Sequence, residues 1–340
     1  MISKIIEEAK VQQAKKLIEK SQKIIIVSHM SPDGDAVGSS LAMYHFLLEL
    51  EKDVQVILPD AFPDFLNWLN ASGDILLYDR YPQYAEEAFD AADLILCMDF
   101  NSHHRVGENL KQLLEKSSAK KILIDHHLDP DETFDVSISY PSMCATAEVA
   151  FRLICCMGYF EEINRNCAEA IYTAMMTDTG RFSYNSDSPE IYYIIAELIK
   201  KGVNKDEIHR RVYQNESLDR MRLRGYIIYE KMKVIPTLQC AIITLTEDEM
   251  LHFNCQKGDT EGLVNIPLDI KNVNCSVLFK EDRQAGKIKI SFRSIGNIAV
   301  NELSNKYFNG GGHKNAAGGS WYASMEEAVE LFKKVLPDYM

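Results

Sequence analysis

Short apolar segments alternate with helical segments through the first half of the chain, and this alternation limits the possible folds more than any other feature. Apolar runs at 23–28, 54–58, 93–100 and 120–125 have the length and composition of buried strands. Residues 36–50, between the first two runs, repeat apolar side chains at helical spacing. Continuously apolar strands joined by helices are typical of a parallel sheet covered on both faces. The sequence therefore predicts an α/β fold built on a doubly wound parallel sheet.

The pattern becomes helical after residue 144. Residues 144–159 and 166–178 have helical periodicity. A further helix is predicted to have Ser188 as its N-cap, Pro189 at its first position and Gly202 as its stop. We therefore expect a parallel-sheet domain over residues 1–190, followed by a helical connection over 191–220.

Residues 221–340 are predicted to form a smaller, mixed α/β domain. Apolar runs at 239–245, 274–282 and 287–294 predict strands, the last two joined as a hairpin. Thr246 and Glu249 fit a helix capping box. A helix over 297–307 would then lead into a glycine-rich loop over 309–320.

Composition narrows the class of partner. Lysine and arginine number 37 against 50 aspartates and glutamates, a formal net charge of −13. Proteins that bind long nucleic acids usually present a strongly basic face, so this balance favours small substrates over long duplexes. No apolar run approaches the roughly 18–20 residues of a membrane helix. The eight cysteines form no CxxC pair and lie mostly in apolar segments, as in a reducing compartment. We therefore expect a cytoplasmic protein that binds no membrane.

Histidine and aspartate gather where three predicted strands end. Each group alone could be an ordinary turn, because aspartate and glycine are common turn residues and Gly34 would let the backbone turn. The carboxyl ends of parallel strands line one crevice, however, so three such groups together predict a metal site. The residues concerned are His29, Asp33 and Asp35 after the first strand, Asp99 after the third, and Asp125, His126 and His127 after the fourth.

Asp178 follows a strongly apolar helix, and taken alone it would be a solvated helix end. With it, the predicted ligands comprise two imidazoles, four carboxylates and no thiolate, a set that suits manganese or magnesium. Six protein ligands exceed what one ion needs if water and substrate also bind. We therefore expect two ions that share one carboxylate. The ligands would be His29, Asp33, Asp35, Asp99, His126 and Asp178.

These motifs together resemble the DHH phosphoesterases. The likeness rests on SHMSPDGDAVGS, the strand-end Asp99, the triplet DHH at 125–127 and TDTGRF, while FRS and GGGHKNAAGG resemble the associated DHHA1 domain. It extends from about residue 23 to 321 and is closest to the stand-alone nano-RNase and pAp phosphatase type. It implies hydrolysis of short oligoribonucleotides, linear dinucleotides such as pApA, and 3′-phosphoadenosine 5′-phosphate. It also implies two Mn²⁺ ions, with Mg²⁺ possible, and a homodimer.

The resemblance also implies roles for the site residues. His29 and Asp33 would hold one ion, and Asp99 would bridge to a second ion held by Asp35, His126 and Asp178. Asp125 would orient a ligating histidine, and His127 would stabilise phosphate oxygens or the leaving group. The candidate catalytic residues are thus Asp99, Asp125 and His127.

Substrate contacts are expected from an arginine after the second motif and from the C-terminal motif. Arg105 is a candidate phosphate clamp, with a solvated surface arginine as the alternative. Glycines let backbone N–H groups approach an anion, although a flexible turn is their common use. Asn309 stands where the family often has another glycine, and asparagine also tolerates left-handed backbone. His103 and His104 are either surface residues or further contacts. The C-terminal candidates are Arg293, Gly310, Gly311, Gly312 and His313.

Other functions stay open at this point. A cyclic-dinucleotide phosphodiesterase, a single-strand-specific exonuclease, and a polyphosphatase or pyrophosphatase would use the same first domain. A non-catalytic nucleotide sensor would have lost ligands, whereas every ligand position is filled here.

Overall fold

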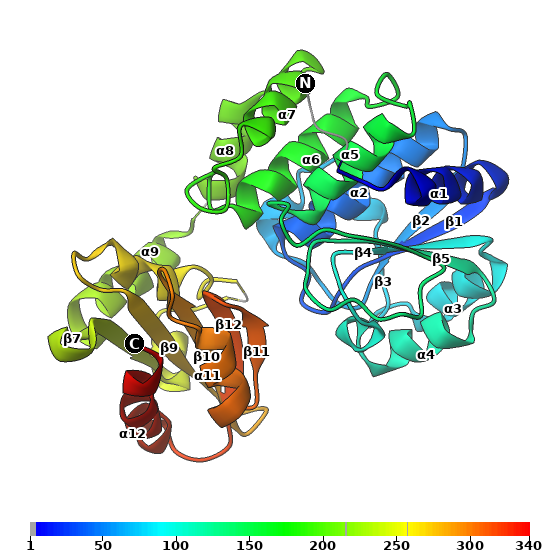
Figure 1. Ribbon diagram of the computed structural model, residues 1–340. Helices are drawn as coiled ribbons and strands as arrows, with labels where there is room; N and C mark the ends of the chain where they lie inside the picture. Colours follow the sequence, from blue (N-terminus) through cyan, green and yellow to red (C-terminus); the bar gives the residue numbers. More distant parts are fainter. Residues whose placement is uncertain (1–4, 215, 257) are drawn as a thin grey trace. The chain divides into compact units, whose positions relative to one another are not determined.

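The computed structural model describes residues 5–214, 216–256 and 258–340. The chain divides into two compact units, and the second begins at Glu216. Figure 1 shows the elements of each unit. The described part of the chain contains no helix with the length and apolar character needed to cross a membrane.

The first unit is built on a six-stranded parallel sheet, as predicted, in the order β3-β2-β1-β4-β5-β6. β1 pairs with β2 on one side and β4 on the other, so the strand order reverses between β1 and β4. Ligands of open α/β sheets bind at such a reversal, outside the carboxyl ends of the strands. The strands are β1 Lys23–Val27, β2 Asp53–Leu58, β3 Leu76–Leu77, β4 Leu94–Met98, β5 Lys120–Asp125 and β6 Val136–Ser139.

Helices cover both faces of this sheet (Figure 1). Ile24 and Ile26 of β1 pack into the core with α1, α2, α5 and α6, whereas Ile25 and Val27 pack into the core with α3 and α4. Burial of successive residues on opposite faces explains why the strands are continuously apolar. The helices are α1 Glu8–Lys20, α2 Gly34–Glu49, α3 Pro82–Ala91, α4 Glu108–Lys116, α5 Thr146–Cys156 and α6 Arg165–Asp178.

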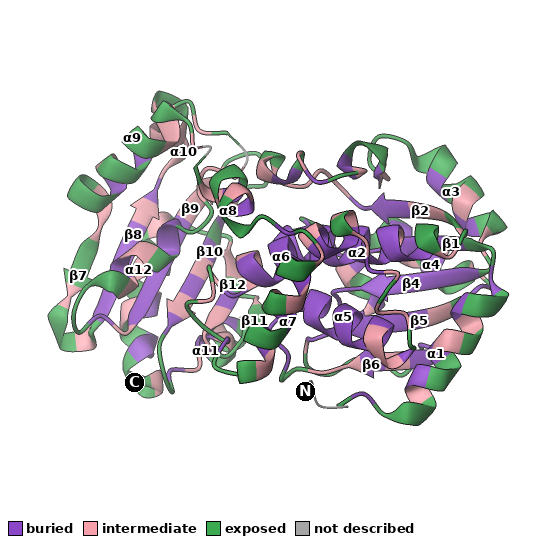
Figure 2. Ribbon diagram, turned by 90° about the horizontal axis from the view of Figure 1, so that it is seen from above, coloured by how far each residue is buried: buried purple, intermediate pink, exposed green. Residues whose placement is uncertain are grey.

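α2 and α6 approach each other closely. Figure 2 shows that α2 is buried along most of its length. A Cβ atom on Gly34 would lie 2.2 Å from Oγ1 of Thr177, and one on Gly38 would lie 2.7 Å from Cβ of Ala174. The prediction that Gly34 serves a backbone turn is wrong, because its φ is not positive. Its missing side chain instead permits the helix contact.

Residues 191–220 include most of α7 Pro189–Lys200, all of α8 Lys205–Tyr213 and the start of α9 Leu218–Tyr226. Ser188 caps α7 and Pro189 is its first residue, as predicted. Buried residues of α7 and α8 belong to the core of the first unit, and α9 belongs to the second unit.

The second unit contains a six-stranded mixed sheet in the order β11-β12-β10-β9-β8-β7. The predicted β9–β10 hairpin and the capping box of Thr246 and Glu249 are confirmed. α11 and α12 pack on one face of the sheet and α9 on the other. The strands are β7 Lys233–Ile235, β8 Cys240–Leu245, β9 Cys275–Asp282, β10 Lys287–Ser294, β11 Gly311–His313 and β12 Ala316–Trp321, and the helices α10 Glu247–His252, α11 Val300–Tyr307 and α12 Met325–Val335.

The glycine-rich loop predicted over 309–320 is wrong, because this segment forms the antiparallel β11–β12 pair. A Cβ on Gly310 would lie 1.9 Å from the carbonyl oxygen of Gly318, and one on Gly312 would lie 2.5 Å from that of Ala316. Both glycines are therefore needed for close backbone approach. Asn309 has a φ of 50°, the left-handed conformation that asparagine tolerates.

Short helices complete the described elements. Those of 3₁₀ type are Asp64–Leu66, Ser72–Asp74, His103–Val106, Pro236–Leu238, Leu263–Asp269 and Leu336–Tyr339, and Ile227–Lys231 is a π-helix.

Candidate metal centre

The turn after β1 brings three predicted ligands to the carboxyl end of the sheet. His29 lies 6% exposed just beyond the strand. Asp33 is the N-cap of α2, and its Oδ1 accepts hydrogen bonds from the N–H groups of Asp35 and Ala36 at 3.0 and 3.1 Å. Capping and ligation are therefore compatible for Asp33, because it also lies in a ligand group with His29 and Asp99.

Asp99 is at the centre of the cluster. It follows β4 in the left-handed conformation, with a φ of 63°, and its side chain is 2% exposed. Its carboxylate oxygens lie 3.4 Å from Nε2 of His29, 3.7 Å from Nε2 of His126 and 3.7 Å from Nδ1 of His127. A non-glycine residue in this conformation costs about 1 kcal/mol or more and is held by its surroundings.

All six predicted ligands meet in overlapping groups. Within each group, the ligand atoms lie within 4.8 Å of one another. Asp99 belongs to two of the groups and His126 to two, so the three groups form one continuous cluster. The groups are His29, Asp33 and Asp99; Asp35, His126 and Asp178; and Asp99, His126 and His127.

Both predicted ligand histidines are oriented by backbone carbonyls. Nδ1 of His29 lies 2.8 Å from the carbonyl oxygen of Met30, and Nδ1 of His126 lies 3.2 Å from that of Met143. A ring that donates through Nδ1 leaves Nε2 as a lone-pair donor. In both rings Nε2 is the nitrogen that faces the carboxylates.

The amino end of α5 holds two of the carboxylates. Asp35, 1% exposed, accepts hydrogen bonds from the N–H groups of Thr146 and Ala147 at 2.6 and 3.1 Å. The hydroxyl of Thr146 donates to Oδ1 of Asp99 at 2.8 Å. The positive end of a helix dipole favours a carboxylate there. Thr146 was not predicted, because a threonine that starts a helix is too common to signal a site.

Asp125 supports His127. Its Oδ1 lies 2.8 Å from Nδ1 of His127, so the imidazole that it orients is His127 and not one of the two predicted ligands. Asp125 is fully buried, and its Oδ2 has no hydrogen-bond partner among the described residues.

The cluster has too little positive charge of its own. Burial raises the pKa of Asp35 well above its usual value, and the charges of Asp99 and Asp178 raise it further. Burial also raises the pKa of Asp178 to about 7, although His126 opposes this rise. Burial lowers the pKa of His29, but the hydrogen bond with Asp99 and the charge of Asp33 outweigh it and raise the pKa to about 9.

Within the described ranges, no lysine or arginine forms an ion pair with Asp33, Asp35, Asp99 or Asp178. Divalent cations would supply the missing charge, and oxygen-rich sites with imidazole suit Mn²⁺ or Mg²⁺. The donor set therefore fits a pair of such ions.

Three residues of the helix His103–Val106 were considered as substrate contacts. Arg105 is half-buried, its carbonyl accepts the N–H of Met30 at 2.8 Å, and its charge acts on His127. His103 is buried edge-on against Phe134, with ring centroids 4.9 Å apart. His104 is exposed and bonds to Ser102. Arg105 is therefore the one of the three that lies beside the cluster.

Candidate substrate contacts of the second unit share one face of its sheet. Arg293 of β10 and His313 of β11 both lie opposite Ala316 of β12, one from each side. Directly opposed residues project from the same face. Gly311 and Gly318 are opposed on that face too, and a Cβ on Gly311 would meet nothing within 4 Å. An arginine and a histidine thus flank a floor of alanine and glycine.

Each of the two units matches a different protein-family model. A model of the DHH family, N-terminal domain, matches residues 23–175, and a model of the DHHA1 domain matches residues 237–340. A Bacillus subtilis (strain 168) relative, named bifunctional oligoribonuclease and PAP phosphatase NrnA, is 26% identical over 91% of this chain and 92% of its own length.

Two solved structures are also similar to this chain over nearly its whole length. An exopolyphosphatase-related protein from Bacteroides fragilis is 50% identical, with a TM-score of 0.96 over 99% of this chain and 98% of that one. RecJ from Thermus thermophilus, in complex with Mn²⁺, is 17% identical, with a TM-score of 0.53 over 97% of this chain and 54% of that one. The second likeness shows a shared fold.

Proposed function

The chain belongs to the DHH family of phosphate-ester hydrolases, and on this basis we propose that it cleaves short oligoribonucleotides, linear dinucleotides such as pApA, and 3′-phosphoadenosine 5′-phosphate. The observation that carries the proposal is the position of Asp99, a buried carboxylate between two groups of ligand atoms. The name of the Bacillus subtilis relative supports this class of substrate.

We assign the six ligands to two Mn²⁺ ions, with Mg²⁺ as the alternative. His29 and Asp33 would hold one ion, Asp35, His126 and Asp178 would hold the other, and Asp99 would be shared between them. Two ions held in this way would supply an activated water and would neutralise the negative charge that develops at phosphorus. His127, oriented by Asp125, donates to a phosphate oxygen or to the leaving group. Arg105, beside His127, holds the phosphate.

The second unit supplies the contacts that select substrate length. Arg293 and His313 donate to a terminal phosphate, which lies on the floor of Ala316, Gly311 and Gly318. We expect rates to fall as oligonucleotides become longer.

A substrate panel with purified protein and Mn²⁺ tests this function. It contains 3′-phosphoadenosine 5′-phosphate, pApA, RNA of two to about ten nucleotides, cyclic di-AMP, pyrophosphate and short polyphosphate. We expect rapid cleavage of the first two and of the shortest RNAs. Preference for cyclic di-AMP would favour a cyclic-dinucleotide phosphodiesterase. Preference for polyphosphate, suggested by the name of the Bacteroides fragilis relative, would overturn the substrate assignment. Metal binding without hydrolysis would indicate a sensor.

Thr146→Val is expected to weaken Mn²⁺ binding by roughly tenfold, as loss of a hydrogen bond to a ligand often does. Valine has the shape of threonine but cannot donate to Asp99, whereas Thr146→Ser keeps the donor and should restore affinity. Calorimetric titration of the metal-free protein measures the effect. Thr173→Val is the matched control, because Thr173 is equally buried and its hydroxyl donates to the carbonyl of Glu169. Equal losses for both valine variants would contradict the positioning role of Thr146.

Gly311→Ala is expected to raise KM for pApA by about tenfold and to leave kcat within about twofold, because uniform binding is lost. The added methyl meets no protein atom within 4 Å and φ is not positive, so the fold tolerates it. It would occupy the surface where we place the phosphate. Gly310→Ala is the contrast, because its Cβ would collide with β12, and it should lower Tm. An unchanged KM for Gly311→Ala would show that the phosphate does not bind on this face.

A further inference from the structure

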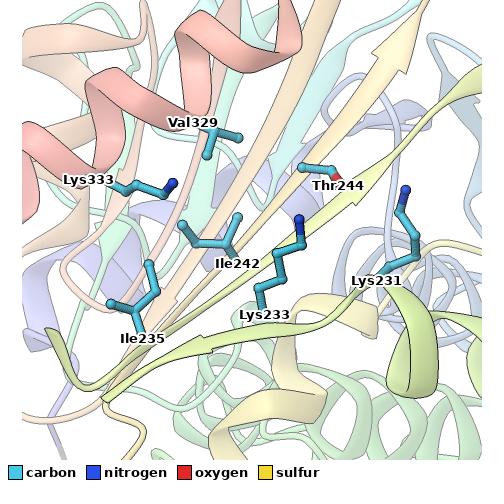
Figure 3. A pocket seen from close by; sticks show the side chains of 7 residues that line it. All are labelled: Lys231, Lys233, Ile235, Ile242, Thr244, Val329 and Lys333. Atoms are coloured by element: carbon cyan, nitrogen blue, oxygen red, sulfur yellow. The ribbon is translucent and has the colours of Figure 1, made fainter. Parts of the chain in front are cut away.

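The second unit has a small cavity lined by lysines, at the sheet edge formed by β7 and β8. Its volume is about 140 Å³. Figure 3 shows the side chains of three lysines, two isoleucines, a valine and a threonine that line it. The lining residues are Lys231, Lys233, Ile235, Ile242, Thr244, Val329 and Lys333.

Strand register and helix placement create this cavity. Lys233 lies opposite Ile242 across the antiparallel β7–β8 pair, and strand alternation places Ile235 and Thr244 on the same face. α12 crosses this face, where Val329 and Lys333, one helical turn apart, line the cavity. β7 is an edge strand of three residues, so the cavity lies at the edge of the sheet, where residues of β7, β8 and α12 line it.

The cavity is separate from the face that carries Arg293. Ile242 shares a hydrophobic core with Phe292, under α11 and α12. Arg293 is next to Phe292 in β10 and therefore projects from the opposite face. β7 and β11 are also the two opposite edges of the sheet. A ligand in the cavity would not touch the contacts proposed for the substrate.

The lysines retain donors for a ligand. Nζ of Lys231 lies 2.6 Å from Glu249, which also accepts from the hydroxyl of Tyr226. Nζ of Lys333 lies 2.7 Å from Glu330, whose side chain is 71% exposed. An ammonium has three donors, and each glutamate engages one of them. Lys233 has no ion-pair partner in the described ranges.

The size and chemistry of the cavity select the ligand. At roughly 30 Å³ for each water molecule, the volume accommodates several waters, which is enough space for a tetrahedral phosphate group. Three lysines and one threonine hydroxyl line the cavity and provide donors, while Glu249 and Glu330 offset part of the charge. The apolar floor offers no ligand for a metal cation.

We propose that this cavity is a binding site for a phosphate group, either inorganic phosphate or the terminal phosphate of a mononucleotide. The proposal does not depend on the metal centre or on the substrates assigned to it. A phosphatase releases inorganic phosphate and a nuclease releases mononucleotides, so both sources are chemically available to a phosphate-ester hydrolase.

The test uses the full-length, metal-free protein with isoleucine δ1 methyl groups labelled for NMR. Inorganic phosphate is titrated at constant ionic strength against chloride. We expect saturable shifts of the Ile235 and Ile242 methyl signals, with methyl groups of the first unit, such as Ile24, unchanged. AMP is titrated in a second arm. Tighter binding of AMP than of phosphate would identify a mononucleotide as the ligand, and equal or weaker binding would identify free phosphate.

Lys233→Gln should weaken phosphate binding at these methyl groups by about tenfold, the effect of losing one charged donor. Lys334→Gln is the matched control, since Lys334 is exposed on α12 beside Lys333 and does not line the cavity. Shifts equal to those caused by chloride would overturn the proposal. So would equal affinities of the wild type and Lys233→Gln.

Discussion

We expect Asp99→Asn to abolish hydrolysis, with a kcat that is lower by about a thousandfold or more. The amide keeps the shape of the side chain and can still accept from Thr146, but it lacks the negative charge that a shared ligand needs. Metal ions contribute several kcal/mol of charge stabilisation in such sites, and each 1.36 kcal/mol corresponds to a factor of ten in rate. Steady-state kinetics over a range of Mn²⁺ concentrations measure the loss.

Asp93→Asn is the control for this experiment. Asp93 directly precedes β4 as Asp99 follows it, so the two aspartates flank the same strand. The carboxylate of Asp93 accepts from the backbone of Gln22 and Lys23, at the amino end of the sheet. We expect activity within about twofold of wild type, as for most changes remote from a site. Normal turnover by Asp99→Asn would refute the shared-metal assignment.

Arg152→Ala is expected to lower the free energy of unfolding of the first unit by about 3–5 kcal/mol. Arg152 is 3% exposed and bonds to Glu148 at 2.7 and 2.9 Å and to Glu190 at 2.7 Å. Glu148 is equally buried and caps the backbone N–H of Cys144 at 2.8 Å. Removing the arginine leaves this glutamate charged, buried and without its main partner.

Urea unfolding followed by Trp68 fluorescence measures this loss, in a Trp321→Phe background so that the signal reports the first unit alone. Arg165→Ala provides the comparison, because Arg165 is 65% exposed in its pair with Glu169. Such surface pairs contribute less than about 1 kcal/mol. Similar losses of unfolding free energy for the two variants would show that burial of the Arg152 pair does not increase its contribution to stability. Glu148→Gln combined with Arg152→Met should recover part of the stability, because it removes both buried charges.

The strands that carry the proposed ligands were predictable because their signals are local. A short apolar run followed by aspartate or histidine fixes both the strand and the end at which its side chain lies, as for β4 and Asp99. The parallel sheet then brings these ends together without further information. The meeting of Asp35 with Asp178 has a different origin, since it depends on the close contact between α2 and α6 at Gly34 and Gly38.

The errors lie where tertiary contacts override local preference. β3 has two residues and β12 contains adjacent glycines, so neither has a strand pattern. β12 forms because its neighbours β10 and β11 supply the hydrogen bonds. Gly34 was assigned to a turn because glycine usually serves there, whereas its role is visible only from the partner helix. Thr146 donates a hydrogen bond to Asp99, which lies 47 positions away in the sequence. No local sequence pattern predicts a contact over that separation.

The division of the hydrophobic cores has an evolutionary consequence. Among the described residues, every buried cluster lies wholly within one unit, and the six ligand positions all belong to the first. Substitutions in the core of the second unit therefore affect a different hydrophobic core from the one that supports the proposed ligands. If the second unit binds the substrate as proposed, lineages can vary the molecules that they accept without changing the core that supports the proposed ligands.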